Sequence, residues 1–157
     1  MSETTLVFDT EIHPRFRDLN MGNHIDSVEA IRVIDEARIQ FLRFAPLAPN
    51  PDGVVGLLGT LPSGVGELVA AQRVDYHAEM RFAAFRGFDA RLWVSRVGGS
   101  SFDVSTELHA VPDAPPSLIA VTTVALWDHN AQRSWAMSEE FRAVLTAFLA
   151  PPVPLRG

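Results

Sequence analysis

Cysteine is absent from this 157-residue sequence, and its absence excludes several kinds of chemistry. The chain can form no disulfide bond, no thiolate metal site and no cysteine nucleophile. Freedom from disulfides also suits a reducing compartment. We therefore expect a cytoplasmic protein that has neither redox-active nor metal-binding thiols.

Long apolar runs and clustered positive charge are missing as well. No uninterrupted apolar run approaches the roughly 20 residues of a membrane span, because Pro151, Pro152 and Pro154 interrupt the nearest one. Residues 1–5 lack the basic and apolar regions of a signal peptide. Only 13 basic residues stand against 19 acidic ones, for a formal charge of −6. We therefore expect a soluble protein with neither a membrane nor a nucleic acid as its partner.

The composition that is present is that of an ordinary globular domain. With 47% hydrophobic residues, a chain of this length can bury a substantial core, so we expect one domain over residues 1–157. Strand patterns and capping signals predict a first strand, a polar loop, a long helix, five further strands and a closing helix. These elements span 5–16, 17–25, 27–45, then 54–60, 66–77, 88–97, 101–111 and 118–127, and finally 139–149.

This order predicts an α+β fold in which a curved antiparallel sheet packs on one long central helix. Apolar side chains on most faces of that helix predict its burial over most of its circumference. One helix cannot cover both faces of such a sheet, so we expect a partner chain to extend the sheet and finish the core. A homodimer or a dimer of dimers would do so.

The most informative segment is the polar loop that leads into the long helix. Asp18, Asn20, His24 and Asp26 lie within nine positions there, and each can move a proton or hydrogen-bond a carbonyl. Asp26 is the predicted N-cap, with Glu29 completing a capping box. Free backbone N–H groups of the first helical turn would lie beside these side chains and stabilise negative charge on an oxygen. This combination is typical of an acyl-transfer site.

Four segments together resemble a known family. Residues 18–27 (Asp-Leu-Asn-Met-Gly-Asn-His-Ile-Asp-Ser) take the spacing of a loop written Asp-x-Asp-x-x-Gly-His-Val-Asn-Asn, and Glu-Ala-Arg follows at 36–38. Val-Asp-Tyr at 74–76 and the hairpin at 96–102 match two further family segments. In the order and spacing of these segments, the chain resembles the hotdog-fold acyl-CoA thioesterases of the 4-hydroxybenzoyl-CoA thioesterase-like group.

The resemblance implies a hotdog fold and the hydrolysis of an acyl-CoA, or secondarily an acyl-ACP, to the free acid and thiol. In this family the sites form between two subunits, so a partner chain would complete each site. Coenzyme A would be part of the substrate and product, with no retained cofactor. No metal is needed, and His24-x-Asp26 alone is too weak a pattern for a metal site.

One departure from the family pattern affects the chemistry. Asn20 stands where the family has its second loop Asp, the usual nucleophile or general base. Asn20 and His24 could still orient a thioester carbonyl or a water molecule, and the carboxylate role would fall to Glu36 or Asp26. Each assignment has a structural alternative: His24 as a brace for the loop, Asp26 as a plain N-cap, and Glu36 as an ion-pair partner of Arg32.

The predicted hairpin offers a candidate contact for coenzyme A. The resemblance implies that it lies near the phosphates, where Arg96, Ser100 and Ser101 could hold them. A Gly-Gly-Ser-Ser turn also forms without a ligand. A rival function follows from Asn20, since a site without the family carboxylate could belong to an acyl-CoA-binding sensor or scaffold with little turnover.

Overall fold

The computed structural model describes residues 4–45, 56–83 and 86–157. Its elements are β1 (Phe8–Ile12), the 3-10 helix η1 (Phe16–Asp18), α1 (Ser27–Phe44), the 3-10 helix η2 (Leu57–Thr60), β2 (Val65–Tyr76), β3 (Phe88–Val97), β4 (Ser101–His109), β5 (Leu118–Asp128), β6 (Arg133–Ser134) and α2 (Glu139–Thr146). The strands form one antiparallel sheet in the order β1-β3-β4-β5-β2, with β6 paired to β5. In the described part of the chain, β1 and β2 are therefore the two edges of the sheet.

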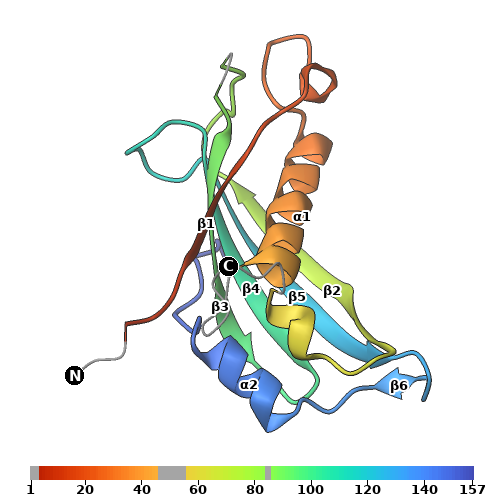
Figure 1. Ribbon diagram of the computed structural model, residues 1–157. Helices are drawn as coiled ribbons and strands as arrows, with labels where there is room; N and C mark the ends of the chain where they lie inside the picture. The colour runs from red at the N-terminus through yellow and green to blue at the C-terminus, as the bar shows by residue number, and fades with distance from the viewer. Residues whose placement is uncertain (1–3, 46–55, 84–85) are drawn as a thin grey trace.

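The long helix α1 lies along one face of this sheet (Figure 1). Alternate side chains of the central strands point toward it, and Leu92, Val104 and Val124 are fully buried there. On the helix side, the Phe41 ring packs between the rings of Phe8 and Phe148, at centroid distances of 5.4 and 5.1 Å. The predicted architecture, one long helix against an antiparallel sheet with a closing helix, is confirmed.

None of the described helices is both long enough and apolar enough to cross a membrane.

The sheet-facing side of α1 is formed by its buried residues, which are Ala30, Val33, Ile34, Ala37, Arg38, Phe41 and Leu42. The opposite side is more open than predicted. Val28 is 71% exposed and Phe44 is 53% exposed, so within one chain α1 is buried on one side rather than over most of its circumference.

The predicted strand at 54–60 is wrong over the part of it that the structure describes, since Leu57–Thr60 forms η2; residues 54 and 55 lie outside the described residues. The cause is close packing at the end of α1. The Gly56 amide donates to the Arg43 carbonyl at 2.8 Å, and a Cβ on Gly56 would lie 2.4 Å from the Leu42 carbonyl oxygen. This approach brings Leu57 fully into the core, where a tight turn fits and an extended strand does not.

Part of the outer face of the sheet is covered by a segment of the same chain. Helix α2 ends at Thr146, three residues before its predicted end, and the chain then runs beside β3. The Val94 amide donates to the Phe148 carbonyl at 3.0 Å, and the Ala150 amide donates to the Val94 carbonyl at 2.9 Å. The Trp93 indole N–H donates to the Pro151 carbonyl at 2.8 Å. Residues 150–155 thereby cover a small apolar cluster of Trp93, Ile119 and Val121.

Strand β2 is paired on one side only among the described strands. It is a long strand of 12 residues, and its Leu68 and Val69 side chains are about half exposed. An unpaired edge that carries apolar side chains is a template for pairing with another strand. We therefore keep the expectation that two copies of the chain join here.

We expect light scattering at micromolar concentration to give two or four times the 17.2 kDa mass of one chain, because β2 can pair with its copy and two such dimers can associate. Val69→Lys puts a charge on this edge and should shift the population toward the monomer. Val111→Lys is the matched control, since Val111 is exposed to a similar extent but lies in a turn. A wild-type protein that is monomeric throughout would contradict the expectation.

Candidate functional site

A cavity of about 560 Å³ opens beside the N-terminus of α1. Its walls are the loop before α1 and the segment that follows β2. The lining residues are Asn20, His24, Ile25, Asp26, Ser27, Ala30, Tyr76, His77, Ala78, Glu79 and Met80. The structure thus gathers Asn20, His24 and Asp26, three of the four residues predicted to be catalytic, around one cavity.

Asn20 fixes the shape of the loop. Its side-chain Oδ1 accepts hydrogen bonds from the Gly22 amide at 2.9 Å and from the His24 amide at 3.2 Å. Asn23 takes a positive φ of 61°, a left-handed conformation that Asn tolerates. Because Oδ1 is held by two backbone donors, the Asn20 Nδ2 group is the end of the amide that a ligand can use. Among the described residues, no acceptor contacts this nitrogen.

Asp26 is the N-cap of α1, as predicted, because its Oδ1 accepts from the Val28 amide at 3.0 Å. The predicted capping box does not form. The Glu29 carboxylate turns instead toward Arg15, at 3.2 Å, while the Asp26 amide donates to the Asp18 carbonyl at 3.0 Å. Asp26 therefore has a structural role at the same point where it lines the cavity.

The first helical turn has a backbone donor at the cavity-lining residue Ser27. Ser27 lines the cavity, and no acceptor for its amide is present in residues 4–45, 56–83 and 86–157. The Ser27 carbonyl accepts from the Tyr76 hydroxyl at 3.1 Å. Burial, followed by the nearby Asp26 charge, raises the pKa of Tyr76, so this hydroxyl stays a neutral donor at physiological pH. Sequence analysis identified Tyr76 only as part of a strand motif.

A second residue that the sequence did not point to is Glu79. Its Oε2 lies 3.3 Å from the His24 Nε2 atom and accepts from the Arg81 guanidinium at 2.9 and 3.1 Å. The hydrogen bond from Arg81, and then the charges of His24 and Arg81, hold the pKa of Glu79 below its usual range. The cavity therefore contains an ionised carboxylate beside the histidine, although Asn20 replaces the carboxylate expected in the loop.

Glu36 lies outside this cavity in its own chain. It is ten residues beyond Asp26, which corresponds to about 15 Å along a helix. Its Oε2 accepts from the Arg32 Nη1 atom at 2.8 Å, and its side chain is 45% exposed. This ion pair with Arg32 is the structural role that the sequence analysis gave as the alternative for Glu36. The catalytic assignment of Glu36 stays a prediction and requires that Glu36 reach a site from a partner subunit.

The β3–β4 hairpin lies at the other end of the sheet. Arg96 makes two hydrogen bonds of 2.9 Å to the Asp103 carboxylate and one of 3.0 Å to Ser101 Oγ; the Asp103 contact raises the pKa of Arg96. Ser101 pairs with Ala125 of β5, whereas the end of β2 at the cavity pairs with Leu118. Seven positions along a strand separate these two points by about 23 Å.

The loop is anchored to α1 by a buried carboxylate, Asp18. Its side chain is fully buried and meets two guanidiniums, with Arg15 at 2.9 Å and Arg32 at 2.6 Å. The Arg15 amide also donates to it at 2.7 Å. These hydrogen bonds outweigh the effect of burial and hold the pKa of Asp18 far below its usual range. Asp18 is therefore ionised whenever the loop is folded.

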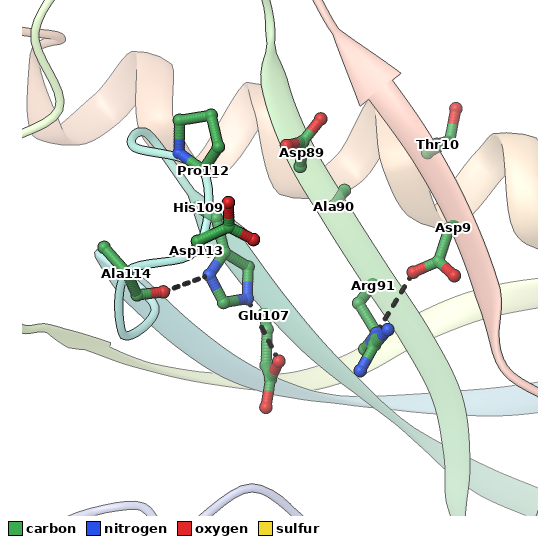
Figure 2. A pocket seen from close by; sticks show the side chains of 10 residues that line it. All are labelled: Asp9, Thr10, Asp89, Ala90, Arg91, Glu107, His109, Pro112, Asp113 and Ala114. Carbon is green, nitrogen blue, oxygen red and sulfur yellow. Dashed lines mark hydrogen bonds and ion pairs between the residues drawn. The ribbon is translucent and has the colours of Figure 1, made fainter.

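Another cavity, of about 520 Å³, lies on the sheet beneath the 112–114 turn (Figure 2). Its charged groups largely contact each other: Arg91 donates to Asp9 at 3.1 Å, and the His109 ring lies between Glu107 and the Ala114 carbonyl. None of the residues predicted to be functional lies there. Within the described ranges, no three His, Asp or Glu side chains are grouped so as to hold a metal ion.

Comparison with known proteins gives one family. The family model described as the thioesterase-like superfamily matches residues 14–145. This span contains the loop, α1, strands β2–β5 and every residue that lines the cavity at α1. A search of the curated proteins found no match.

Several solved structures share the fold. A predicted thioesterase from Bacillus stearothermophilus has a TM-score of 0.69 at 16% identity, covering 94% of this chain and 100% of that one. A thioesterase superfamily protein from Jannaschia sp. CCS1 has a TM-score of 0.72 at 15% identity, covering 96% and 98%. A hypothetical protein from Staphylococcus aureus, solved in complex with CoA, has a TM-score of 0.69 at 11% identity, covering 100% and 91%. The likeness confirms the predicted hotdog fold.

We expect Asp18→Asn to lower the free energy of unfolding by about 3 kcal/mol at pH 7, because it leaves two guanidiniums without their buried partner. Urea unfolding measures this loss. Since folding lowers the pKa of Asp18, its contribution is complete above the ordinary value of about 4 and is lost as the pH falls further. The difference between wild type and variant should therefore shrink in acid.

Asp9→Asn is the matched control for this prediction. Asp9 also pairs with an arginine, Arg91, but both side chains are more than half exposed. Exposed pairs contribute about 1 kcal/mol or less. Equal losses from Asp9→Asn and Asp18→Asn would contradict the role given to Asp18.

Proposed function

The chain belongs to the thioesterase-like superfamily, and on that basis we propose that it hydrolyses an acyl-CoA thioester to the free acid and thiol in the cavity at the start of α1. The observation that carries this proposal is that one loop delivers Asn20, His24 and Asp26 to a cavity that is also lined by Ser27, the first residue of α1. The CoA complex of the Staphylococcus aureus neighbour supports CoA as the carrier; acyl-ACP is the second choice.

The proposed reaction begins with the thioester carbonyl held by two donors. The Asn20 Nδ2 group and the Ser27 amide would contact the carbonyl oxygen, which becomes negatively charged as a tetrahedral intermediate forms. One well-placed donor of this kind is worth about 3 kcal/mol of transition-state stabilisation. The positive end of the α1 dipole acts on the same oxygen.

Water then supplies the nucleophile. A group of the cavity takes one proton as the water oxygen bonds to the carbonyl carbon, the C–S bond breaks, and the thiolate receives the proton to leave as the thiol. Within the chain we propose Asp26 for this proton transfer, with His24 orienting the water, and Glu36 could act only from a partner subunit. Coenzyme A enters and leaves as part of substrate and product, so we propose neither a resident cofactor nor a metal.

Arg96, Ser100 and Ser101 remain our proposed contacts for the coenzyme A phosphates. A phosphate would have to share or replace the Asp103 carboxylate that Arg96 now binds. Because the hairpin lies about 23 Å from the cavity of its own chain, such a contact belongs to a site that includes residues of a second subunit.

The alternative function is acyl-CoA binding with little turnover, and the observation that favours it is Asn20 in place of the loop carboxylate. Thiol release from acetyl-, hexanoyl-, palmitoyl- and benzoyl-CoA separates the two. The chain has no cysteine, so a thiol reagent reports coenzyme A without a background from the protein. Binding without thiol release, unchanged by His24→Ala, would support the binding protein.

Asn20→Asp is expected to fold normally and to retain or increase hydrolysis. One carboxylate oxygen can accept from the Gly22 and His24 amides as Oδ1 does now. The other replaces the Nδ2 donor with the carboxylate that the family pattern has at this position, which can act as nucleophile or general base and so offset the lost donor. Asn20→Ala removes both loop hydrogen bonds and the donor to the substrate, so kcat for the best acyl-CoA of the panel should fall by about 100-fold. If Asn20→Ala hydrolyses acyl-CoA as fast as wild type, Asn20 is not part of the site.

Asp26→Asn and Glu36→Gln separate the two carboxylates that the sequence proposed. Asn is as good an N-cap as Asp, and the exposed Arg32–Glu36 pair contributes little to folding, so both variants should fold. We expect Asp26→Asn to lower kcat by about 100-fold, as for loss of a proton acceptor, and Glu36→Gln to have a small effect. The reverse result would assign the proton transfer to Glu36 of a partner subunit.

A further inference from the structure

We propose that Glu79 is the positioning residue of this site: it holds the His24 ring with its hydrogen on Nε2, which leaves Nδ1 as the hydrogen-bond acceptor that orients the attacking water. This inference rests on the proposed function and adds to it a residue from outside the loop. The loop has Asn20 where the family pattern has a carboxylate, and the segment after β2 brings a carboxylate, Glu79, to the same cavity.

The backbone holds Glu79 and His24 in register. The Ile25 amide donates to the Met80 carbonyl at 2.8 Å, and the Phe82 amide donates to the Asn23 carbonyl at 3.3 Å. His24 and Arg81 form an antiparallel bridge between these two hydrogen bonds. The distance of 3.3 Å between His24 Nε2 and Glu79 Oε2 is therefore set by a short paired segment of backbone, and not only by two free side chains.

The pairing selects one form of the ring. An ionised carboxylate accepts hydrogen bonds only, so the ring nitrogen that faces it carries the hydrogen. When the His24 ring is neutral, its lone pair is then on Nδ1. A Cβ built on Gly22 would lie 3.7 Å from Nδ1 and 3.5 Å from the Asn20 Oδ1 atom, so Nδ1 and the Asn20 amide lie beside the same residue of the loop.

Arg81 keeps this arrangement constant over the working pH range. Its guanidinium donates twice to Glu79 Oε2, the same oxygen that His24 approaches, and lowers the pKa of Glu79. Glu79 is therefore ionised at neutral pH and cannot donate a hydrogen to the ring. Because its side chain is 58% exposed, solvent competes for the carboxylate, and we expect an effect on kcat of about 10-fold, smaller than the roughly 100-fold or more of a group that transfers the proton itself.

The test combines a spectroscopic measurement with kinetics on the full chain. Long-range 1H–15N spectra distinguish the two neutral forms of a histidine ring, and the His24 signals are identified by their loss in His24→Asn. The variants are Glu79→Leu, which removes the acceptor, and Glu79→Gln, which keeps one acceptor oxygen. Glu67→Leu is the matched control, because Glu67 also pairs with an arginine, Arg43, and does not line the cavity.

In wild type we expect the hydrogen on Nε2 of neutral His24. Glu79→Leu should mix the two ring forms and lower kcat about 10-fold, while KM for the best acyl-CoA of the panel changes much less. The kcat of Glu79→Gln should lie between those of Glu79→Leu and wild type. Glu67→Leu should match wild type in both ring form and kcat. An unchanged ring form in Glu79→Leu, or a loss of activity through KM alone, would overturn the inference. If wild type hydrolyses no acyl-CoA, the proposed function fails, while the ring form still tests whether Glu79 positions His24.

Discussion

A single buried carboxylate sets the geometry of the candidate site. Asp18 binds Arg15, which precedes η1, and Arg32, which lies in the second turn of α1, so it joins the start of the loop to the helix that follows. Its carbonyl accepts from the Asp26 amide and holds the N-cap as well. The cost of burying this charge is offset by two guanidiniums and a backbone donor. Only with both ends fixed can the loop present Asn20 and His24 to one cavity.

The site is completed by a segment distant in sequence. The loop supplies the Asn20 amide and α1 supplies its first free amide, while the end of β2 supplies Tyr76 and the segment after β2 supplies Glu79. Short backbone hydrogen bonds join the two segments, so their side chains meet at fixed distances. A carboxylate near the histidine therefore need not come from the loop, since a different part of the sheet can bring one to the same cavity.

The local patterns of the sequence predicted most of the fold. Strict alternation placed β3 at its observed bounds, and the Asp26 cap placed the start of α1. The failures have a common physical origin in tertiary contact: η2 is a turn because Gly56 packs on the end of α1. The loop residues of the site were predictable because they are adjacent in sequence. Glu79 was not predictable, because its contact with His24 depends on the pairing of two backbone segments. That pairing leaves no recognisable pattern in the sequence of either segment.

The cover that residues 150–155 form over part of the outer sheet face has a consequence for the order of folding. The contacts of these residues, such as Trp93 with the Pro151 carbonyl, need β3 already in place. Until they dock, the apolar side chains of Trp93, Ile119 and Val121 are therefore exposed on the paired strands. Exposed apolar surface of this kind makes a folding intermediate prone to association, so residues 150–155 act as an intramolecular cover that removes this surface from solvent.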